Sequence, residues 1–124
     1  MNDKKIIYKD LKLSNILIYL DRLDKCLIKL SNINKSNSYS INGNSYIMAP
    51  EVLKDEKKII NSKSNIWSLG IIIYYMLFKE YPYNGKVEYQ ILKEIESNKQ
   101  LKFSNDDKLN DLLSKMLKVE VNER

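Results

Sequence analysis

A run of apolar residues at positions 66–78 most constrains how this chain of 124 residues can fold. Its sequence, IWSLGIIIYYMLF, places apolar side chains on nearly every face of a helix, whereas a helix on a protein surface has one polar face. Ser64 stands just before the run and can cap this helix. We therefore predict a helix that is buried on all sides and forms the centre of the fold.

The segments on either side of this run predict smaller elements around it. Residues 16–20 and 26–30 are short β-prone runs that flank a polar turn, which is typical of a β-hairpin, and Cys26 is expected to be buried in it. Apolar residues at helical spacing predict two amphipathic helices packed on the central one. Their apolar stripes consist of Val87, Ile91, Leu92 and Ile95, and of Leu109, Leu112, Leu113, Met116 and Leu117. The expected fold is mainly α with a small β-hairpin, an α+β arrangement.

Composition and charge exclude several classes of protein. With 44% hydrophobic and 30% charged residues, the chain is typical of one globular domain. The net charge is +5, but the lysines are interleaved with acidic residues and no zinc-ligand spacing or nucleic-acid motif occurs, so no nucleic acid is expected as a partner. The first residues lack the apolar core of a signal peptide, and the apolar run is shorter than the ~20 residues of a bilayer span. One cysteine cannot form an internal disulfide, so we expect a soluble protein of the cytoplasm or another intracellular compartment, without membrane association.

Four sequence features occur in a fixed order along the chain. The segment IIYKDLKLSNILI (6–18) comes first, and a polar segment (31–45), MAPE (48–51) and IWSLG (66–70) follow. This order resembles the C-terminal lobe of eukaryotic-type Ser/Thr protein kinases, in which the catalytic loop reads D-x-K-x-x-N. The resemblance covers nearly the whole chain and implies that residues 1–124 are a partial protein kinase domain, without the N-terminal lobe.

The resemblance implies catalytic roles for three residues of the first segment. Asp10 would accept or orient the proton of a substrate hydroxyl, and Lys12 would steady the transferred phosphoryl group. Asn15 would hold Mg2+ through its amide oxygen, so ATP and Mg2+ are implied as cofactors, bound in part through Lys12 and Asn15. The residues by themselves also allow a simpler interpretation, in which Asp10 and Asn15 only hydrogen-bond the backbone of their loop.

At several positions the chain departs from the kinase pattern. The metal-binding Asp after the second strand is replaced by Asn32, and Asn15 is also neutral, so this implied metal site is degenerate and no anionic protein ligand remains at the matched positions. Asn44 replaces a threonine that positions the substrate, and Asn65 replaces the Asp that ties the central helix to the catalytic loop. Lys9 replaces an arginine, and its point charge would grip a phosphorylated loop less well than a planar guanidinium.

The resemblance also implies an ion pair between Glu51 and Arg124, which is buried in kinases. Because Arg124 is the last residue and chain ends fray, we predict that the pair is weak in solution. The resemblance further implies that the helix which covers the central helix in kinases is missing. We therefore expect the isolated chain to expose apolar surface.

These features together predict a protein kinase-like domain whose ancestral activity is ATP-dependent phosphorylation of Ser or Thr on proteins, without catalysis by this chain alone. A second interpretation is a pseudokinase that docks a partner through the helix 87–95 and the polar loop, and a third is a truncated gene relic without function. The expected partner is a protein substrate, a docked protein, or another chain that supplies the N-terminal lobe.

Overall fold

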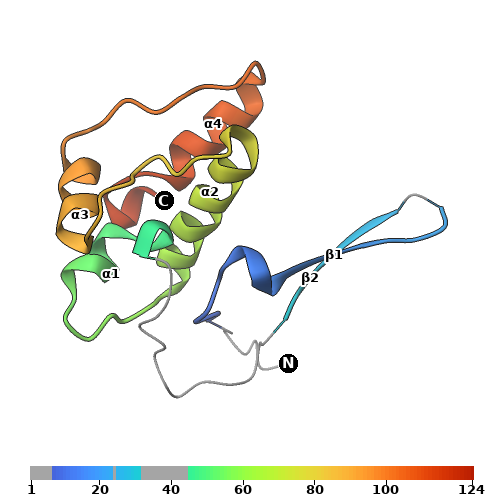
Figure 1. Ribbon diagram of the computed structural model, residues 1–124, viewed down its shortest axis with the longest axis horizontal. Helices are drawn as coiled ribbons and strands as arrows, with labels where there is room; N and C mark the ends of the chain where they lie inside the picture. Colours follow the sequence, from blue (N-terminus) through green and yellow to red (C-terminus); the bar gives the residue numbers. More distant parts are fainter. Residues whose placement is uncertain (1–6, 24, 32–44) are drawn as a thin grey trace.

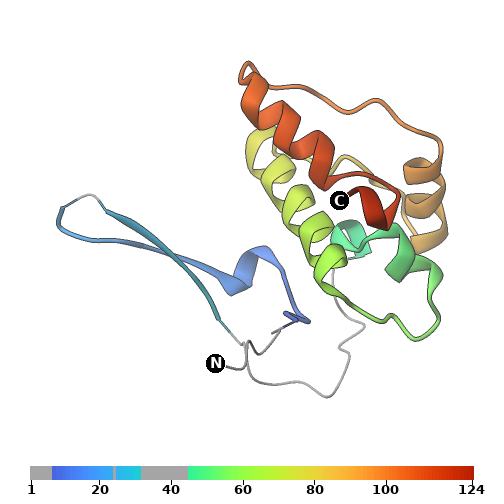
Figure 2. The same cartoon turned by 180° about the vertical axis from the view of Figure 1, so that it is seen from behind.

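The computed structural model describes residues 7–23, 25–31 and 45–124 of the chain. Its elements, in chain order, are the 3-10 turn η1 (Leu13–Asn15), strands β1 (Ile16–Leu20) and β2 (Cys26–Leu30), the 3-10 turn η2 (Ser45–Ile47), helices α1 (Pro50–Lys54), α2 (Ser62–Phe78), α3 (Glu88–Glu96) and α4 (Asp107–Met116), and the 3-10 turn η3 (Val121–Glu123). The helices form one body, and the β1–β2 hairpin projects away from it (Figure 1, Figure 2). The prediction of a mainly helical fold with a two-stranded antiparallel sheet is confirmed.

The central helix α2 begins earlier than its apolar run predicts. Asn61 is the N-cap, because its side chain accepts hydrogen bonds from the backbone N–H groups of Lys63 and Ser64. The Ser64 hydroxyl accepts a hydrogen bond from the Asn61 N–H in return, at 2.9 Å. Ser64 is therefore the third residue of a capping box and not the cap itself. The helix ends at Phe78, and the C-cap residue Lys79 has a φ of 59°, in the left-handed region.

Only one side of α2 is buried. Trp67, Ile71 and Ile72 lie in the core of the helical body. The exposed large apolar side chains of the helix are Leu69, Met76 and Leu77. The prediction that α2 is buried on all sides is therefore wrong, because within the described part of the chain this side remains open to solvent.

Helix α4 packs directly against α2. Gly70 permits this close approach, since a Cβ atom at this position would lie 2.9 Å from Leu117 Cδ2 and 3.1 Å from Met116 Cβ. Leu113 and Met116 are buried, as their apolar stripe predicts, whereas Leu112 of the same stripe is 47% exposed.

Helix α3 packs mainly against α1 and η2 rather than along α2. Ile91 and Ile95 are buried and belong to the same core as Trp67, so the amphipathic pattern identified the inward face correctly. Val87 lies outside this face because it is the N-cap residue of the helix and is exposed. The two predicted amphipathic helices are thus confirmed, but only α4 has α2 as its main neighbour.

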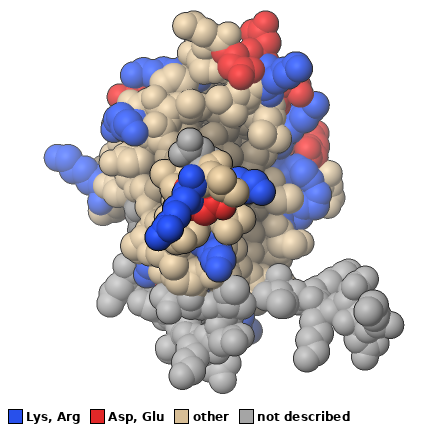
Figure 3. All heavy atoms as spheres, turned by 90° about the vertical axis from the view of Figure 1, so that its right-hand side faces the viewer, with Lys and Arg blue, Asp and Glu red and all other residues tan. Residues whose placement is uncertain are grey.

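The hairpin has the predicted strands. Ile16 pairs with Leu30 at its base, and the register continues to the pair nearest the turn, Leu20 with Cys26. The Asp21 carboxylate closes the turn by accepting hydrogen bonds from two backbone N–H groups. Cys26 is exposed, so the prediction of a buried thiol is wrong, and the reason is that the outer part of the hairpin is covered on neither face. Figure 3 looks onto the side on which the hairpin projects, where basic and acidic atoms lie close together near the middle of the view.

None of the helices in residues 7–23, 25–31 and 45–124 combines the length and the apolar character needed to cross a membrane.

Candidate active site

Three of the residues assigned to catalysis lie together in the loop that enters β1. The Asn15 side chain donates its Nδ2 hydrogens to the Asp10 carbonyl oxygen at 2.7 Å and to Asp10 Oδ2 at 2.9 Å. The Lys12 ammonium lies 3.0 Å from the same Oδ2 atom. Asn15 is only 3% exposed, whereas the side chains of Asp10 and Lys12 are 39% and 41% exposed. The loop therefore presents a carboxylate and a cation to solvent. The buried amide of Asn15 holds the carboxylate in place.

The geometry of this loop agrees with both interpretations of Asp10 and Asn15, the catalytic role and the stabilisation of the loop backbone. The bond from Asn15 to the Asp10 carbonyl oxygen is the loop-stabilising role that an Asx residue has in many proteins. The second bond, to the carboxylate, orients the one acidic side chain of the loop. A carboxylate that is fixed in direction and open to solvent is able to accept a proton from a hydroxyl group.

Tyr8 fastens this loop to the end of the hairpin. Its hydroxyl group donates a hydrogen bond to the Ser31 carbonyl oxygen, and the Ser31 N–H donates to the Asn15 carbonyl oxygen at 2.9 Å. Burial raises the pKa of Tyr8, and the negative charge of Asp10 raises it further. Tyr8 therefore stays neutral and keeps its proton as a donor. Nothing in the sequence pattern indicated this contact.

Asn32 and Asn44 lie outside the described residues, so the prediction that Asn32 faces Asp10 and Asn15 stays a prediction. The described neighbour of Asn32 is Ser31, which the hydrogen bond to Asn15 places beside the site. Within the described ranges, no three His, Cys, Asp or Glu side chains come together as a metal-binding group.

The described donor atoms do not fit a magnesium ion. Mg2+ binds through one or two carboxylates together with phosphate oxygens and water. Asp10 is the one acidic side chain in this loop, and the Lys12 ammonium already lies against its Oδ2 atom, where it would repel a second cation. Asn15 offers only the neutral oxygen of its amide, because the amide nitrogen carries two hydrogens and donates them to Asp10. The described side chains of the loop therefore provide one carboxylate that is already paired and one neutral oxygen.

Two further residues from the motif comparison are Asn65 and Lys9. Asn65 is half-buried on α2, and within the described part of the chain its side chain makes no hydrogen bond. Lys9 is exposed. Apolar contacts join the loop to the helical body, because Leu11 and Ile16 pack against the core of that body.

Glu51 and Arg124 form an ion pair beside the first turns of α2. Glu51 Oε2 lies 2.6 Å from Arg124 Nη2, the Arg124 side chain is fully buried and that of Glu51 is 22% exposed. The guanidinium group lies over the Trp67 ring at 5.3 Å from its centroid, and Nη1 donates to the Lys63 carbonyl oxygen at 3.3 Å. The Lys63 ammonium in turn donates to the Arg124 carbonyl oxygen. The ion pair is thus accompanied by three further contacts at the last residue.

A second polar network, around Glu88 at the start of α3, was not predicted. Ser45 Oγ donates to Glu88 Oε1 at 3.1 Å, and the Lys58 ammonium lies 2.8 Å from Glu88 Oε2 and 3.0 Å from the Leu53 carbonyl oxygen. The hydrogen bond from Lys58 is the largest cause that lowers the pKa of Glu88. The network joins η2, helix α3 and the segment that follows α1. These parts are far apart in sequence, so no local pattern could have revealed the network.

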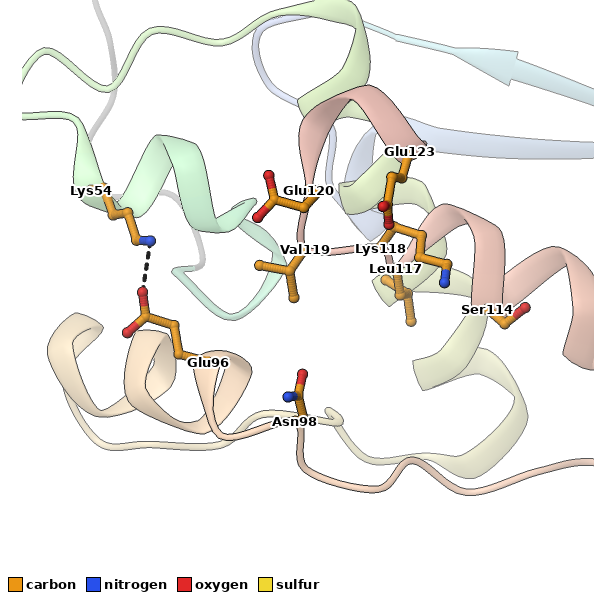
Figure 4. A pocket seen from close by; sticks show the side chains of 9 residues that line it. All are labelled: Lys54, Glu96, Asn98, Ser114, Leu117, Lys118, Val119, Glu120 and Glu123. Carbon is orange, nitrogen blue, oxygen red and sulfur yellow. Dashed lines mark ion pairs between the residues drawn. The ribbon is translucent and has the colours of Figure 1, made fainter.

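A cavity of about 710 Å³ lies between α1 and α3 on one side and α4 and η3 on the other (Figure 4). It is lined by Lys54, Glu96, Asn98, Ser114, Leu117, Lys118, Val119, Glu120 and Glu123. Lys54 and Glu96 form an ion pair across its edge, with 2.6 Å between the charged atoms. None of the lining residues belongs to the loop of Asp10, Lys12 and Asn15.

Comparison of the sequence with known proteins finds protein kinases in every case reported below. The protein kinase domain family matches residues 1–124. Calcium-dependent protein kinase 4 of Plasmodium falciparum is 33% identical over 129 residues, which cover 94% of this chain and 24% of that protein. Calcium-dependent protein kinase 5 of Plasmodium berghei is 38% identical over 101 residues, and the G2-specific protein kinase nim-1 of Neurospora crassa is 35% identical over 97 residues. The matched part spans 17% and 11% of these two proteins, so the chain corresponds to a quarter or less of each of these relatives.

Proposed function

Because the chain belongs to the protein kinase domain family, we propose that it is a kinase-like domain that has lost phosphoryl transfer as an isolated chain. Its ancestral reaction is the ATP-dependent phosphorylation of Ser or Thr on proteins, the reaction of the family's Ser/Thr branch. The domain comprises residues 1–124 and corresponds to the C-terminal lobe, which normally provides the catalytic loop and the substrate surface.

The arrangement of Asp10, Lys12 and Asn15 is the observation that carries this proposal. In this loop the Asp10 carboxylate contacts the side chains of both Lys12 and Asn15, which supports descent from a phosphoryl-transfer enzyme. Loss of activity is supported by position 32. Asn32 supplies a neutral oxygen where the family has a carboxylate, so the anionic protein ligand for Mg2+ is missing there. ATP and Mg2+ are therefore cofactors of the ancestor and not ligands of this chain.

A thermal-shift measurement tests the proposal. The purified chain is heated with a non-hydrolysable ATP analogue, with Mg2+, or with both, since a ligand that binds only the folded form raises the melting temperature. We expect no ligand-dependent shift for the wild type. A shift of several degrees that requires both ATP analogue and Mg2+ would refute the loss of nucleotide binding.

Asn32→Asp provides the matched test of the metal site. It restores the carboxylate at the implied position, whereas Asn37→Asp adds the same charge to the same polar segment away from the motif. We expect calorimetric Mg2+ affinity to rise in the first variant only, when each is mixed with a competent N-terminal lobe. An equal rise in both variants would mean that charge alone, and not position 32, limits metal binding.

Protein docking is the second candidate function, and the surface of α3 supports it. Val87 and Tyr89 at the start of this helix are 56% and 71% exposed, and the Glu88 network fixes the helix beside η2. Exposed aromatic and apolar side chains on a rigid element are typical of docking surfaces. A partner protein, a former substrate or a separate N-terminal lobe would bind there. Co-purification of a defined partner that Tyr89→Ala releases supports docking, and absence of the translated chain from cells would support a gene relic.

A further inference from the structure

The loop that joins α2 to α3 contains the dipeptide Asn84–Gly85 (Figure 1). Asparagine is a thermolabile residue, and a following glycine, which has no Cβ atom, leaves its backbone nitrogen open to the asparagine side chain. Asn84 is exposed, and both residues have irregular backbone. In the described part of the chain, neither the Asn84 side chain nor the Gly85 N–H group makes a hydrogen bond. The two groups that would react are therefore adjacent and are not held apart by other bonds.

The same loop is fastened to α3 at three points. The Asn84 N–H donates a hydrogen bond to Glu94 Oε2 at 3.1 Å. The Lys86 N–H donates to Gln90 Oε1 at 2.8 Å. Gly85 is buried between these two bonds, and a Cβ atom at this position would lie only 2.6 Å from Gln90 Cβ. The loop therefore packs against the helix without room for an added atom at Gly85.

We propose that Asn84 is a site of spontaneous deamidation, which yields aspartate and isoaspartate and loosens the loop from α3. The Gly85 nitrogen forms a bond to Cγ of Asn84 while the bond between Cγ and Nδ2 breaks. The proton of the Gly85 N–H passes through water to the leaving group, which departs as ammonia. Water then opens the cyclic imide, at Cγ to give aspartate or at the α-carbonyl carbon to give isoaspartate. The net reaction consumes water and releases ammonia, and it needs neither a partner nor a cofactor.

Isoaspartate is the product that disturbs the packing of the loop. Its main chain runs through the former side chain, so a methylene group is added directly before Gly85, where the loop is tight against α3. Both products also place a carboxylate near Glu94, whose Oε2 atom accepts the backbone hydrogen bond of the same residue, and the like charges repel. The first turn of α3 should therefore lose its contacts with the loop. A loss of docking by α3 as the chain ages would rest on the docking function proposed above, whereas the loosening of the loop does not.

Peptide mapping of the folded, full-length chain after incubation at neutral pH tests the modification. Cleavage after lysine places Asn84 in peptide 80–86 and the internal control Asn98 in peptide 94–99. Asn98 is also exposed, but lysine follows it. A further pair, Asn42–Gly43, lies outside the described residues and falls in the separate peptide 36–54. We expect Asn84 to be converted at least about tenfold faster than Asn98, with isoaspartate detected by an isoaspartyl methyltransferase.

The variant Asn84→Gln keeps the amide but requires a larger ring, so the gain in mass of peptide 80–86 should disappear. Conversion of Asn84 no faster than that of Asn98, or conversion that occurs only in urea, would overturn the modification site.

Amide exchange tests the effect on α3. Ion-exchange chromatography separates the aged chain, which carries an added negative charge. Exchange in the first turn of α3 should be at least about threefold faster in the aged wild type than in the fresh chain. It should stay constant in Asn84→Gln after the same incubation, which also controls for changes at Asn42. Asn84→Asp adds the charge without the extra backbone atom, so it should show a smaller increase. Unchanged exchange in the isoaspartate form, or an equal increase in Asn84→Asp, would refute displacement of the loop.

Discussion

Replacing Glu51 by alanine should destabilise the chain strongly, because it leaves a buried guanidinium group without its counter-charge. The partner atoms are 2.6 Å apart and the Arg124 side chain is fully buried, and removal of one partner from a buried ion pair costs roughly 3–5 kcal/mol. Two contacts of Arg124 survive, one with the Trp67 ring and one with the Lys63 carbonyl oxygen. They retain about 1–2 kcal/mol of favourable interaction. We therefore expect a loss of about 1–4 kcal/mol in the free energy of unfolding.

Urea unfolding followed by the fluorescence of Trp67, the one tryptophan of the chain, measures this loss directly. Glu96→Ala is the matched control, because Glu96 and Lys54 are also 2.6 Å apart but their side chains are 48% and 53% exposed. An exposed pair of this kind contributes about 0–1 kcal/mol. The comparison thus holds the ion-pair distance constant and varies the burial.

The reasoning would be refuted if Glu51→Ala and Glu96→Ala shifted the urea midpoint by the same amount. A further variant identifies the cause of a larger shift. Adding Arg124→Met to Glu51→Ala removes the isolated charge and keeps most of the side-chain volume, so part of the lost stability should return. If the double variant were less stable than Glu51→Ala, the packing of Arg124 on Trp67 and not its charge would be the dominant effect.

Three further changes have defined outcomes. Gly70→Ala gains about 1 kcal/mol of helix propensity but crowds Leu117, and overpacking of this kind costs about 1–3 kcal/mol, so urea unfolding should show a net loss. The pKa of Glu88 is lowered from its ordinary value of 4.5 in the folded state, so the stability that it contributes is present above that pH and is lost as the pH falls below it. Lys58→Met removes the main cause of this shift, and the stability difference between wild type and variant should shrink between pH 6 and about pH 3, whereas a constant difference would contradict the assignment. Tyr8→Phe removes the hydroxyl bond at the hairpin base and should cost about 1 kcal/mol, with faster amide exchange in the catalytic loop, and unchanged exchange would show that the bond does not hold the loop.

The sequence by itself determined the local elements and the three residues that meet in the loop before β1. Both strands of the hairpin, the two amphipathic helices and the contact of Asp10, Lys12 and Asn15 follow from short-range patterns. A period of two or of 3.6 residues fixes which side chains share a face, and the D-x-K-x-x-N spacing fits within one loop. These features need no knowledge of the rest of the chain.

Only the tertiary structure decided which of these faces are covered. The apolar pattern predicted burial for Cys26 and for every side of α2, yet the thiol and one side of the helix are exposed, because burial depends on which elements pack together and not on the residues themselves. The contact of Arg124 with Trp67 and the bond of Glu88 to Lys58 likewise join segments that are distant in the sequence. Such pairings are set by the packing of whole helices, which no local period records.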